Sequence, residues 1–400
     1  MTHVVVIGAG QAGASLVARL RSQGFDGAIT LLGEEPVPPY QRPPLSKKYL
    51  LGEMALERLF LRPESAYAEA GIDLRTATRV TAIDRAAQEV VTGEDRLGYD
   101  TLVLATGSRP RRLPPAIGGD LGGVHVVRTL GDVDAMAPGV VPGARVLIVG
   151  GGYIGLEAAA VAAARGLTVT LVEMAPRILQ RVAAPETSDY FRALHTRHGV
   201  DLREGVGLER LLGDGHVTGA RLTDGTELEV DMVIVGVGIT PDTALAEAAG
   251  LDIDNGIAVD ARGQTSDPAI WAAGDCASFP YGSERLRLES VPNAIDMAEC
   301  VADNILGQAR DYVPKPWFWS DQYDVKLQIA GLGAGHDRIV TRDTGAALSV
   351  WYYRGDRLLA VDAMNDPRAY MVGKRLIEAG RTADPALVAD PATDLKALLG

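Results

Sequence analysis

The chain has 400 residues, of which 47% are hydrophobic and 23% are charged, and its formal net charge is −13. This length exceeds what one ordinary hydrophobic core needs, so two or three domains are expected. The acidic balance argues against binding to nucleic acid or to an anionic membrane as a main role.

The cysteine content and the length of the apolar stretches further narrow the class of protein and its compartment. Cys276 and Cys300 are too few for a disulfide framework, and no cluster of His and Cys has metal-ligand spacing, so we expect a reducing compartment and no metal. No apolar stretch is as long as the about 20 residues that a helix needs to span a bilayer. No charged leader precedes the first strand. The sequence therefore predicts a cytoplasmic protein without membrane contact.

The N-terminal segment has the order of a dinucleotide-binding unit. An apolar, β-branched run from Val4 to Ile7 is followed by the motif GAGQAG and by a helical pattern from Ala14 to Leu20. A second apolar run, Ile29 to Leu32, completes a strand, turn, helix and strand.

The spacing of this first motif suits a diphosphate. Gly8 permits a tight turn, Gly10 lets the backbone approach a pyrophosphate, and Gly13 lets the helix pack closely on the strand. An acidic residue after the second strand is expected to hold the adenosine ribose, and Glu34 and Glu35 both stand there, with Glu34 preferred. Taken alone, such a turn also occurs without a ligand.

The same order of elements returns in the centre of the chain. Val146 to Val149 form the predicted strand, GGGYIG the turn, and an Ala-rich segment the helix, before a strand from Val169 to Val172. Gly150, Gly152 and Gly155 occupy the three fingerprint positions. Two such units in one chain make a dinucleotide function much better supported than one copy does.

The residue after the next strand predicts which nicotinamide dinucleotide binds. Glu173 ends VTLVEM, and a carboxylate there accepts hydrogen bonds from a ribose 2′-hydroxyl and repels a 2′-phosphate. Arg177 lies close enough in sequence to meet a phosphate, which leaves NADPH open. We expect NADH to be preferred.

Three later segments end in Gly turns. The residue pattern then changes in the C-terminal part of the sequence. TLVLATGSRP and MVIVGVGITPD are predicted strands, and SDPAIWAAGDCA delivers Asp275 at a turn where a ribityl hydroxyl could be bound. From about Pro314 onward the runs KLQIAGL, RIVTRD, LSVWYY and RLLAVDAM, with a helix near Met371 to Ala379, predict a small antiparallel α+β domain.

Read in order, GAGQAG, ATGSRP, GGGYIG, GVGITPD and WAAGDCA resemble the flavoprotein reductases related to glutathione reductase. PPYQRPPLSKKYL, RLESVPNA and PWFWSDQYDVKLQIAGL resemble, more specifically, the ferredoxin reductases of bacterial cytochrome P450 and aromatic-ring dioxygenase systems. The resemblance implies an α/β fold with two Rossmann-like domains and a small C-terminal α+β domain. Residues 1–112 and 239–315 would form a discontinuous FAD-binding domain, 113–238 the NAD-binding domain and 316–400 the C-terminal domain.

The resemblance also implies the site residues. Lys47, Glu157 and Trp319 would be catalytic, with the Lys47 cation beside the reduced flavin ring. For Trp319 and its neighbour Trp317, packing in the core explains the residue equally well. Cofactor contacts are implied for Gly8, Gly10, Ala12, Gly13, Glu34, Arg42, Lys47, Val80, Ala105, Thr106, Gly107, Arg128, Gly150, Gly152, Tyr153, Ile154, Gly155, Glu157, Glu173, Gly238, Gly274, Asp275, Val291, Pro292 and Trp319.

The segment from Pro36 to Tyr49 differs from that of the dithiol reductases in the same superfamily, because it contains no cysteine. Without a thiol relay, electrons are expected to leave the flavin directly, and Cys276 is interpreted as a small buried residue. A disulfide substrate is not expected.

The sequence thus predicts an FAD-dependent reductase that takes hydride from NADH and passes single electrons to a two-iron two-sulfur ferredoxin, which docks transiently and serves a P450 or ring-hydroxylating oxygenase. The chain is expected to be a monomer or a weak homodimer. Alternatives are a rubredoxin reductase, an NADH oxidase or quinone-type reductase, and a redox sensor like apoptosis-inducing factor.

Overall fold

The computed structural model describes residues 2–400, which form two compact units. Unit 1 contains the N-terminal segment up to Gln41, Ala55–Arg109 and Ile239–Lys315. Unit 2 contains Arg42–Met54, Pro110–Gly238 and Pro316–Gly400. Residues 113–238 and 316–400, which the sequence analysis assigns to two domains, therefore cluster together, and the three-domain division stays a prediction.

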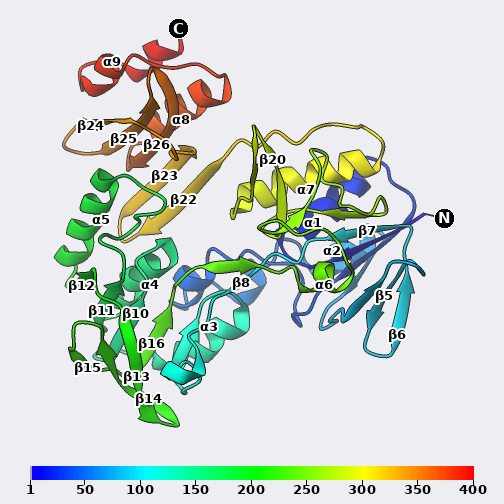
Figure 1. Ribbon diagram of the computed structural model, residues 1–400, viewed down its shortest axis with the longest axis horizontal. Coiled ribbons are helices and arrows are strands. Elements are labelled where there is room, and N and C mark those ends of the chain that lie inside the picture. Colours follow the sequence, from blue (N-terminus) through cyan, green and yellow to red (C-terminus); the bar gives the residue numbers. More distant parts are fainter. Residues whose placement is uncertain (1) are drawn as a thin grey trace. The chain divides into compact units, whose positions relative to one another are not determined.

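Unit 1 is built on a parallel sheet with the strand order β19-β7-β1-β2-β3. The run from Val4 to Ile7 is buried on both faces, as expected for a central parallel strand. Helix α1 begins at Gln11, three residues before the predicted pattern, and contacts α7 (Figure 1). The main elements are β1 (His3–Ile7), α1 (Gln11–Ser22), β2 (Ala28–Leu32), β3 (Ile72–Arg75), β7 (Thr101–Leu104), β19 (Ile270–Ala272) and α7 (Val291–Ile305).

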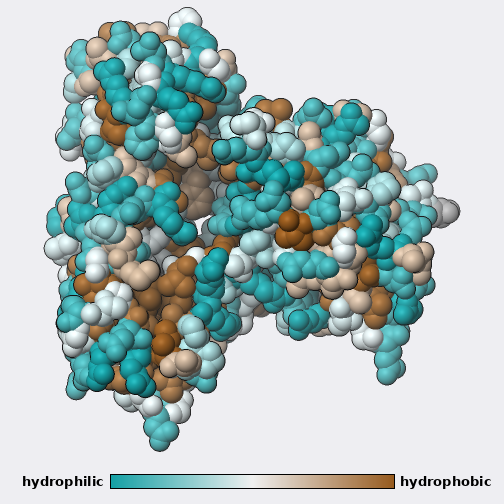
Figure 2. Space-filling model, viewed as in Figure 1, coloured by the Kyte–Doolittle hydropathy of each residue, from teal (hydrophilic) through white to brown (hydrophobic). Residues whose placement is uncertain are grey.

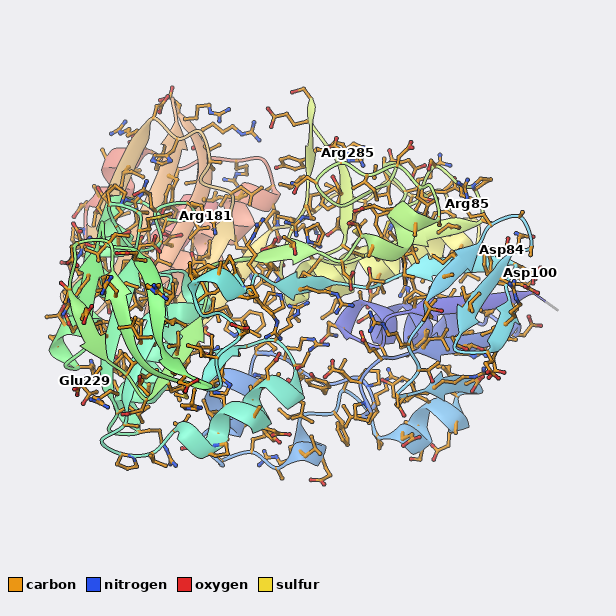
Figure 3. All side chains as sticks on the ribbon, turned by 60° about the horizontal axis from the view of Figure 1, so that its bottom comes forward. Asp84, Arg85, Asp100, Arg181, Glu229 and Arg285 are labelled. Atoms are coloured by element: carbon orange, nitrogen blue, oxygen red, sulfur yellow. The ribbon has the colours of Figure 1, made fainter. Side chains whose placement is uncertain are left out.

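Smaller elements complete unit 1. Arg85, which directly follows β4, bonds Asp267 at 2.7 Å and so ties the β4-β5-β6 sheet to the segment before β19 (Figure 3). The elements are η2 (Leu56–Arg58), α2 (Glu64–Glu69), β4 (Ala82–Asp84), β5 (Glu89–Thr92), β6 (Asp95–Gly98), β8 (Ser108–Pro110), β17 (Ile239–Pro241), α6 (Ala244–Ala248), β18 (Ile257–Ala258), β20 (Ala277–Tyr281) and β21 (Glu284–Leu286).

Unit 2 contains a second parallel sheet, with the order β12-β11-β10-β16-β9. The edge strand β9 has only three residues and, like β12 to β15, is not predicted from the sequence. The elements up to β16 are η1 (Leu45–Tyr49), η3 (Pro115–Ile117), β9 (Val124–Val126), α3 (Leu130–Met136), η4 (Ala137–Gly139), β10 (Arg145–Val149), α4 (Tyr153–Ala164), β11 (Thr168–Glu173), α5 (Pro185–Arg197), β12 (Asp201–Glu204), β13 (Leu208–Asp214), β14 (His216–Leu222), β15 (Glu227–Glu229) and β16 (Met232–Val235).

The C-terminal part of unit 2 is an antiparallel sheet, order β22-β23-β26-β25-β24, covered by α8 (Figure 1). The predicted α+β character is confirmed, and β25 and β26 are buried over most of their length rather than at alternate positions. Helix α8 begins at Pro367, four residues before the predicted start, because the Asp366 side chain caps it by accepting from the N–H of Ala369. The elements are β22 (Trp317–Gln322), β23 (Val325–Gly331), β24 (Arg338–Asp343), β25 (Leu348–Arg354), β26 (Arg357–Met364), α8 (Pro367–Glu378), α9 (Pro385–Ala389) and η5 (Leu395–Leu399).

A buried carboxylate joins this sheet to α5. Asp362 is 2% exposed, and its Oδ2 accepts hydrogen bonds from Thr187 Oγ1, at 2.8 Å, and from the Tyr352 hydroxyl. The N–H of Ala184 in turn donates to the Tyr352 hydroxyl at 2.9 Å. Burial raises the pKa of Asp362 to about 6, although both hydrogen bonds act to lower it.

This raised pKa predicts a stability that depends on pH. The folded state binds the Asp362 proton more tightly than the unfolded chain does, so this contribution is complete below about pH 4 and is lost as the pH rises through about 6. Asp362→Asn removes it. In urea titrations, the unfolding free energy of the wild type should therefore fall, relative to that of Asp362→Asn, by about 1.4 kcal/mol per pH unit as the pH rises from about 4 to about 6. A difference independent of pH would contradict the assignment.

Candidate functional site

The first Gly-rich turn, in unit 1, brings backbone atoms closer than a side chain allows. A Cβ at Gly8, where φ is +114°, would lie 2.1 Å from the carbonyl oxygen of Ala105. A Cβ at Gly13 would lie 2.1 Å from the carbonyl oxygen of Gly8. At Gly10 a Cβ would meet nothing within 4 Å, and no side chain caps helix α1 there. The N-terminus of α1 is thus open to an anion, as a diphosphate requires.

The two glutamates after β2 differ in their surroundings. Glu35 Oε2 accepts a hydrogen bond from the Tyr40 hydroxyl at 2.6 Å. The side chain of Glu34 is 49% exposed, and its ion pairs to Arg79 and Arg109 measure 3.6 and 3.5 Å. This accessibility favours Glu34 as the ribose ligand, which stays a prediction.

Asp275 lies at a Gly turn in the same unit. Ser108 Oγ donates to Asp275 Oδ2 at 3.0 Å, and a Cβ at Gly274 would lie 3.0 Å from the Cβ of Ala12. Arg287 Nη1 donates to the Asp275 carbonyl at 3.2 Å, while its Nε is buried and has no hydrogen-bond partner within residues 2–400. A buried donor beside an acidic turn fits the polar part of a bound dinucleotide cofactor.

The other residues implied for unit 1 lie on elements around these two turns. Gly274 is also close to α7, since its Cβ would lie 3.9 Å from the Cβ of Ala294. The segment after β7 bonds to the chain after β17, because Thr106 Oγ1 donates to the carbonyl of Asp242 at 2.6 Å. The remaining positions are Ala105 and Gly107 after β7, buried Val80 before β4, and Val291 and Pro292 in the first turn of α7.

The second Gly-rich turn, in unit 2, repeats the geometry of the first. A Cβ at Gly150, where φ is +110°, would lie 2.4 Å from the carbonyl oxygen of Gly236. A Cβ at Gly155 would lie 2.0 Å from the carbonyl oxygen of Gly150, whereas one at Gly152 would meet nothing within 4 Å. No side chain caps α4, so its N-terminus is also open to an anion.

Glu173, at the end of β11, has a second role that sequence reasoning missed. Its Oε2 accepts a hydrogen bond from the N–H of Gly151 at 2.7 Å, and its Oε1 accepts one from the N–H of Ala175 at 2.8 Å. The carboxylate therefore holds the Gly-rich turn in place. Each oxygen keeps a further lone pair, so a ribose hydroxyl can still bind.

Cationic side chains lie beside the turn after β16, and unit 2 also exposes large hydrophobic side chains. A Cβ at Gly238 would lie 3.7 Å from Nη2 of Arg181 (Figure 3) and 4.0 Å from Cδ of Arg111. Figure 2 shows hydrophobic surface over the part of unit 2 that contains α4 and β16. Large hydrophobic side chains are exposed at Ile154, Met174 and Val237. Apolar surface with a few charged groups is typical of a small-molecule site.

Lys47 and Glu157 form an ion pair inside unit 2. Lys47 Nζ lies 2.9 Å from Glu157 Oε1, and Ser320 Oγ donates to the same oxygen at 2.8 Å. Glu157 is 5% exposed and is the one charged residue of α4. Burial raises the pKa of Glu157, while Lys47 and Ser320 act to lower it. Lys47 departs from the helical turn η1, with φ −126° and ψ −109°.

Aromatic side chains of β22 lie near this pair in unit 2. The rings of Tyr153 and Phe318 are 4.9 Å apart, and those of Trp317 and Trp319 are stacked at 5.5 Å. The Tyr153 hydroxyl is buried and has no hydrogen-bond partner within residues 2–400. Trp319 therefore has a packing role, and its role near the flavin stays a prediction.

The segment 42–54 is also tied to α3 and its surroundings. Arg42 Nη1 donates to the carbonyl of Arg128 at 2.7 Å, and the Tyr49 hydroxyl donates to Asp134 at 2.8 Å. These bonds fix the segment that carries Lys47 within unit 2. Arg42 and Arg128, both implied as cofactor contacts, are thus neighbours.

Cys276 has the surroundings of a structural residue. It is fully buried, its Sγ lies 3.4 Å from the carbonyl oxygens of Leu104 and Ala273, and burial raises the pKa of its thiol. A raised pKa suppresses the thiolate and with it redox reactivity.

Sequence reasoning missed several polar residues at these sites. Ser320 and Gln322 occupy alternate positions of β22, and both are buried. They stand in a run of three polar residues with Asp321 between them, so no alternation with aromatic residues marks them as buried in the sequence. His195, Arg181 and Arg287 reach their positions only through the tertiary fold, and no sequence pattern indicates them.

The two glycines of the second turn predict opposite effects of the same substitution. Gly150→Ala places a Cβ against the carbonyl oxygen of Gly236 at a positive φ, so we expect a loss of several kcal/mol of stability. Gly152→Ala, the matched control, should fold normally. Thermal unfolding checks both, and equal melting temperatures for the two variants would overturn the geometry.

Comparison with known proteins agrees with this arrangement. The family model "Pyridine nucleotide-disulphide oxidoreductase" matches residues 2–298, and "Reductase C-terminal" matches residues 317–399. The chain is 43% identical over 407 residues to putidaredoxin reductase from Pseudomonas putida, covering 99% of this chain and 96% of that protein. It is 45% identical over 408 residues to a ferredoxin–NAD(P)(+) reductase from Sphingomonas sp., covering 99% and 97%.

A solved structure is similar over the whole length. The covalent putidaredoxin reductase–putidaredoxin complex contains a chain that is 42% identical, with a TM-score of 0.96, covering 100% of this chain and 98% of that chain. The two dinucleotide turns, the C-terminal sheet and these matches lead to one conclusion: the chain belongs to the pyridine nucleotide-disulphide oxidoreductase family.

Proposed function

We propose that this chain is an FAD-dependent, NADH-linked ferredoxin reductase. The observation that carries the proposal is the pair of open helix N-termini, at Gly10 and Gly152, each preceded by a tight turn that only glycine allows. Two dinucleotides, rather than one, are the expected ligands. The segment from Pro36 to Tyr49 contains Lys47 and Lys48 but no cysteine, which favours an acceptor other than a disulfide.

Unit 1 has the residues that suit FAD. The first turn of α1 donates backbone N–H groups to a pyrophosphate, Glu34 accepts from the adenosine ribose, and Asp275 accepts from a ribityl hydroxyl. Ser108 orients the Asp275 carboxylate by donating to one of its oxygens. Bound FAD supplies the redox chemistry that the side chains lack, since a flavin accepts hydride and releases electrons singly.

Unit 2 has the residues that suit the nicotinamide dinucleotide. The first turn of α4 binds the pyrophosphate, and the exposed hydrophobic side chains around it shield the bases from water. Glu173 holds the turn through Gly151 and repels a 2′-phosphate, which favours NADH. The Lys47–Glu157 pair keeps a cation in unit 2 for the electron-rich reduced ring, the role that the family resemblance implies.

The electron acceptor is a ferredoxin with a two-iron two-sulfur centre, which serves a P450 or ring-hydroxylating oxygenase. Support comes from the solved relative, whose structure is a covalent complex with putidaredoxin. Among residues 2–400, no helix has the length and apolar character of a membrane crossing.

Anaerobic rapid mixing of the purified yellow protein with NADH tests the proposal. We expect fast bleaching of the flavin absorbance, and steady-state cytochrome c reduction that requires an added ferredoxin. Turnover with rubredoxin, a quinone or dioxygen in place of ferredoxin would move the chain to another reductase type. Slow bleaching with a long-lived charge-transfer band would indicate a redox sensor.

Glu173 should decide between the two nicotinamide dinucleotides. Glu173→Gln keeps an acceptor for the Gly151 N–H but removes the charge that repels a 2′-phosphate, so the NADH:NADPH ratio of kcat/KM should fall about tenfold, which corresponds to ~1.4 kcal/mol. Glu229→Gln, on β15, is the control: it removes a carboxylate that pairs with Arg145 and should leave the ratio unchanged. Equal ratios in all three proteins would refute this role of Glu173.

A further inference from the structure

A continuous chain of hydrogen bonds leads from Glu157 to the turn after β22. Ser320 Oγ donates to Glu157 Oε1 at 2.8 Å, and Gln322 Nε2 donates to Ser320 Oγ at 3.2 Å. Gln322 Oε1 lies 2.8 Å from His195 Nε2, and the Tyr323 hydroxyl lies 3.2 Å from His195 Nδ1. Ser320, Gln322 and His195 are each fully buried.

An ionised Glu157 fixes the direction of every bond in this chain. A carboxylate only accepts, so Ser320 must give it the hydroxyl proton and can accept only from the Gln322 amide nitrogen. The Gln322 oxygen then faces His195 Nε2, which must carry the proton. His195 Nδ1 is left as an acceptor for the Tyr323 hydroxyl. All four donors therefore point toward the Glu157 carboxylate.

The charged and titratable groups that face Glu157 and His195 are compatible with these hydrogen-bond directions. Glu157 faces Lys47 from η1, with Ser320 and Asp321 on β22, and the Asp321 charge acts to raise its pKa. His195 faces Gln322, Tyr323 and His198, and burial lowers the pKa of His195 to about 4, so the ring is neutral with a single proton. The ordered chain of hydrogen bonds thus offsets the free-energy cost of desolvating the buried Glu157 carboxylate.

Tyr323, at the far end, is held in an unusual conformation. Its φ of +54° is in the left-handed region, where a residue with an aromatic side chain is strained. Its ring stacks on His198 at 3.6 Å, and its hydroxyl reaches His195. Contacts with His195 on α5 and with His198, which directly follows α5, therefore hold this turn at the end of the chain of hydrogen bonds.

We propose that Ser320, Gln322, His195 and Tyr323 are positioning residues that hold the Glu157 carboxylate ionised beside Lys47. In this proposal the four residues act through Glu157. The consequence for flavin chemistry rests on the proposed function, through the role that the resemblance gives Lys47. The ionisation of Glu157 itself does not depend on that function.

Ser320→Ala tests the proposal because it removes the donor next to Glu157. We expect the ionisation midpoint of Glu157 to rise by about one pH unit, a tenfold change in its proton-binding constant. Infrared spectra of the holoprotein over a pH series measure this, with the protonated-carboxyl band assigned by its loss in Glu157→Gln. The pH profile of flavin reduction by NADH should shift in the same direction.

Three further variants separate positioning from packing. Ser320→Thr keeps the hydroxyl and should restore the wild-type midpoint. Gln322→Met, nearly isosteric, leaves Ser320 in place and should give a smaller upward shift, and it serves if Ser320→Ala fails to fold. Ser349→Ala removes another buried hydroxyl of the C-terminal sheet, which accepts from Trp351 Nε1 at 3.1 Å, and should shift nothing.

The outcomes distinguish this inference from the proposed function. An unchanged midpoint in both Ser320→Ala and Gln322→Met, or equal shifts in Ser349→Ala, would overturn the positioning role even if NADH reduces the flavin normally. Failure of NADH to reduce the wild-type flavin would refute the proposed function instead, while the infrared midpoints would still test the chain of hydrogen bonds.

Discussion

Burial of the Glu157 charge is the constraint on which much of unit 2 depends. A carboxylate on an otherwise apolar helix is stable only if partners reach it from elsewhere, because desolvation of an unpaired charge costs several kcal/mol. Lys47 arrives from the segment 42–54 and Ser320 from β22, more than a hundred residues away on either side. The ion pair therefore joins three distant segments, and it can hold a cation in a fixed place only because all three meet at α4.

A second constraint, the close approach of backbones, sets both dinucleotide turns. In each unit a glycine at positive φ packs against a carbonyl of the neighbouring strand segment, and another glycine leaves space before a helix. The two open helix N-termini are therefore backbone features that depend on these glycines. The proposed specificity residues are single carboxylates, Glu34 in unit 1 and Glu173 in unit 2, and Glu173 also accepts a hydrogen bond from the N–H of Gly151 in its turn.

The C-terminal sheet contributes buried polar side chains that bond to α4 and α5 of unit 2. Ser320 and Gln322 extend from β22 to α4 and α5, and Asp362 on β26 bonds Thr187 on α5. Both connections are buried and polar, so each depends on a complete set of partners. Such connections specify one packing arrangement, which a purely apolar interface would leave less defined.

The amino-acid sequence by itself determined both Gly-rich units, their strands and helices, the antiparallel C-terminal sheet and the family resemblance, because these follow from local periodicity and from glycines at fixed spacing. The boundaries of the strands that were predicted agree with the structure to about a residue, whereas β3–β6, β9 and β12–β15 were not predicted. Only the tertiary structure decided that Lys47 meets Glu157, that Glu173 bonds Gly151, and that His195 and Gln322 share a chain of hydrogen bonds. These contacts join residues 22 to more than 100 positions apart, and no local pattern encodes which distant side chain will fill a buried polar position.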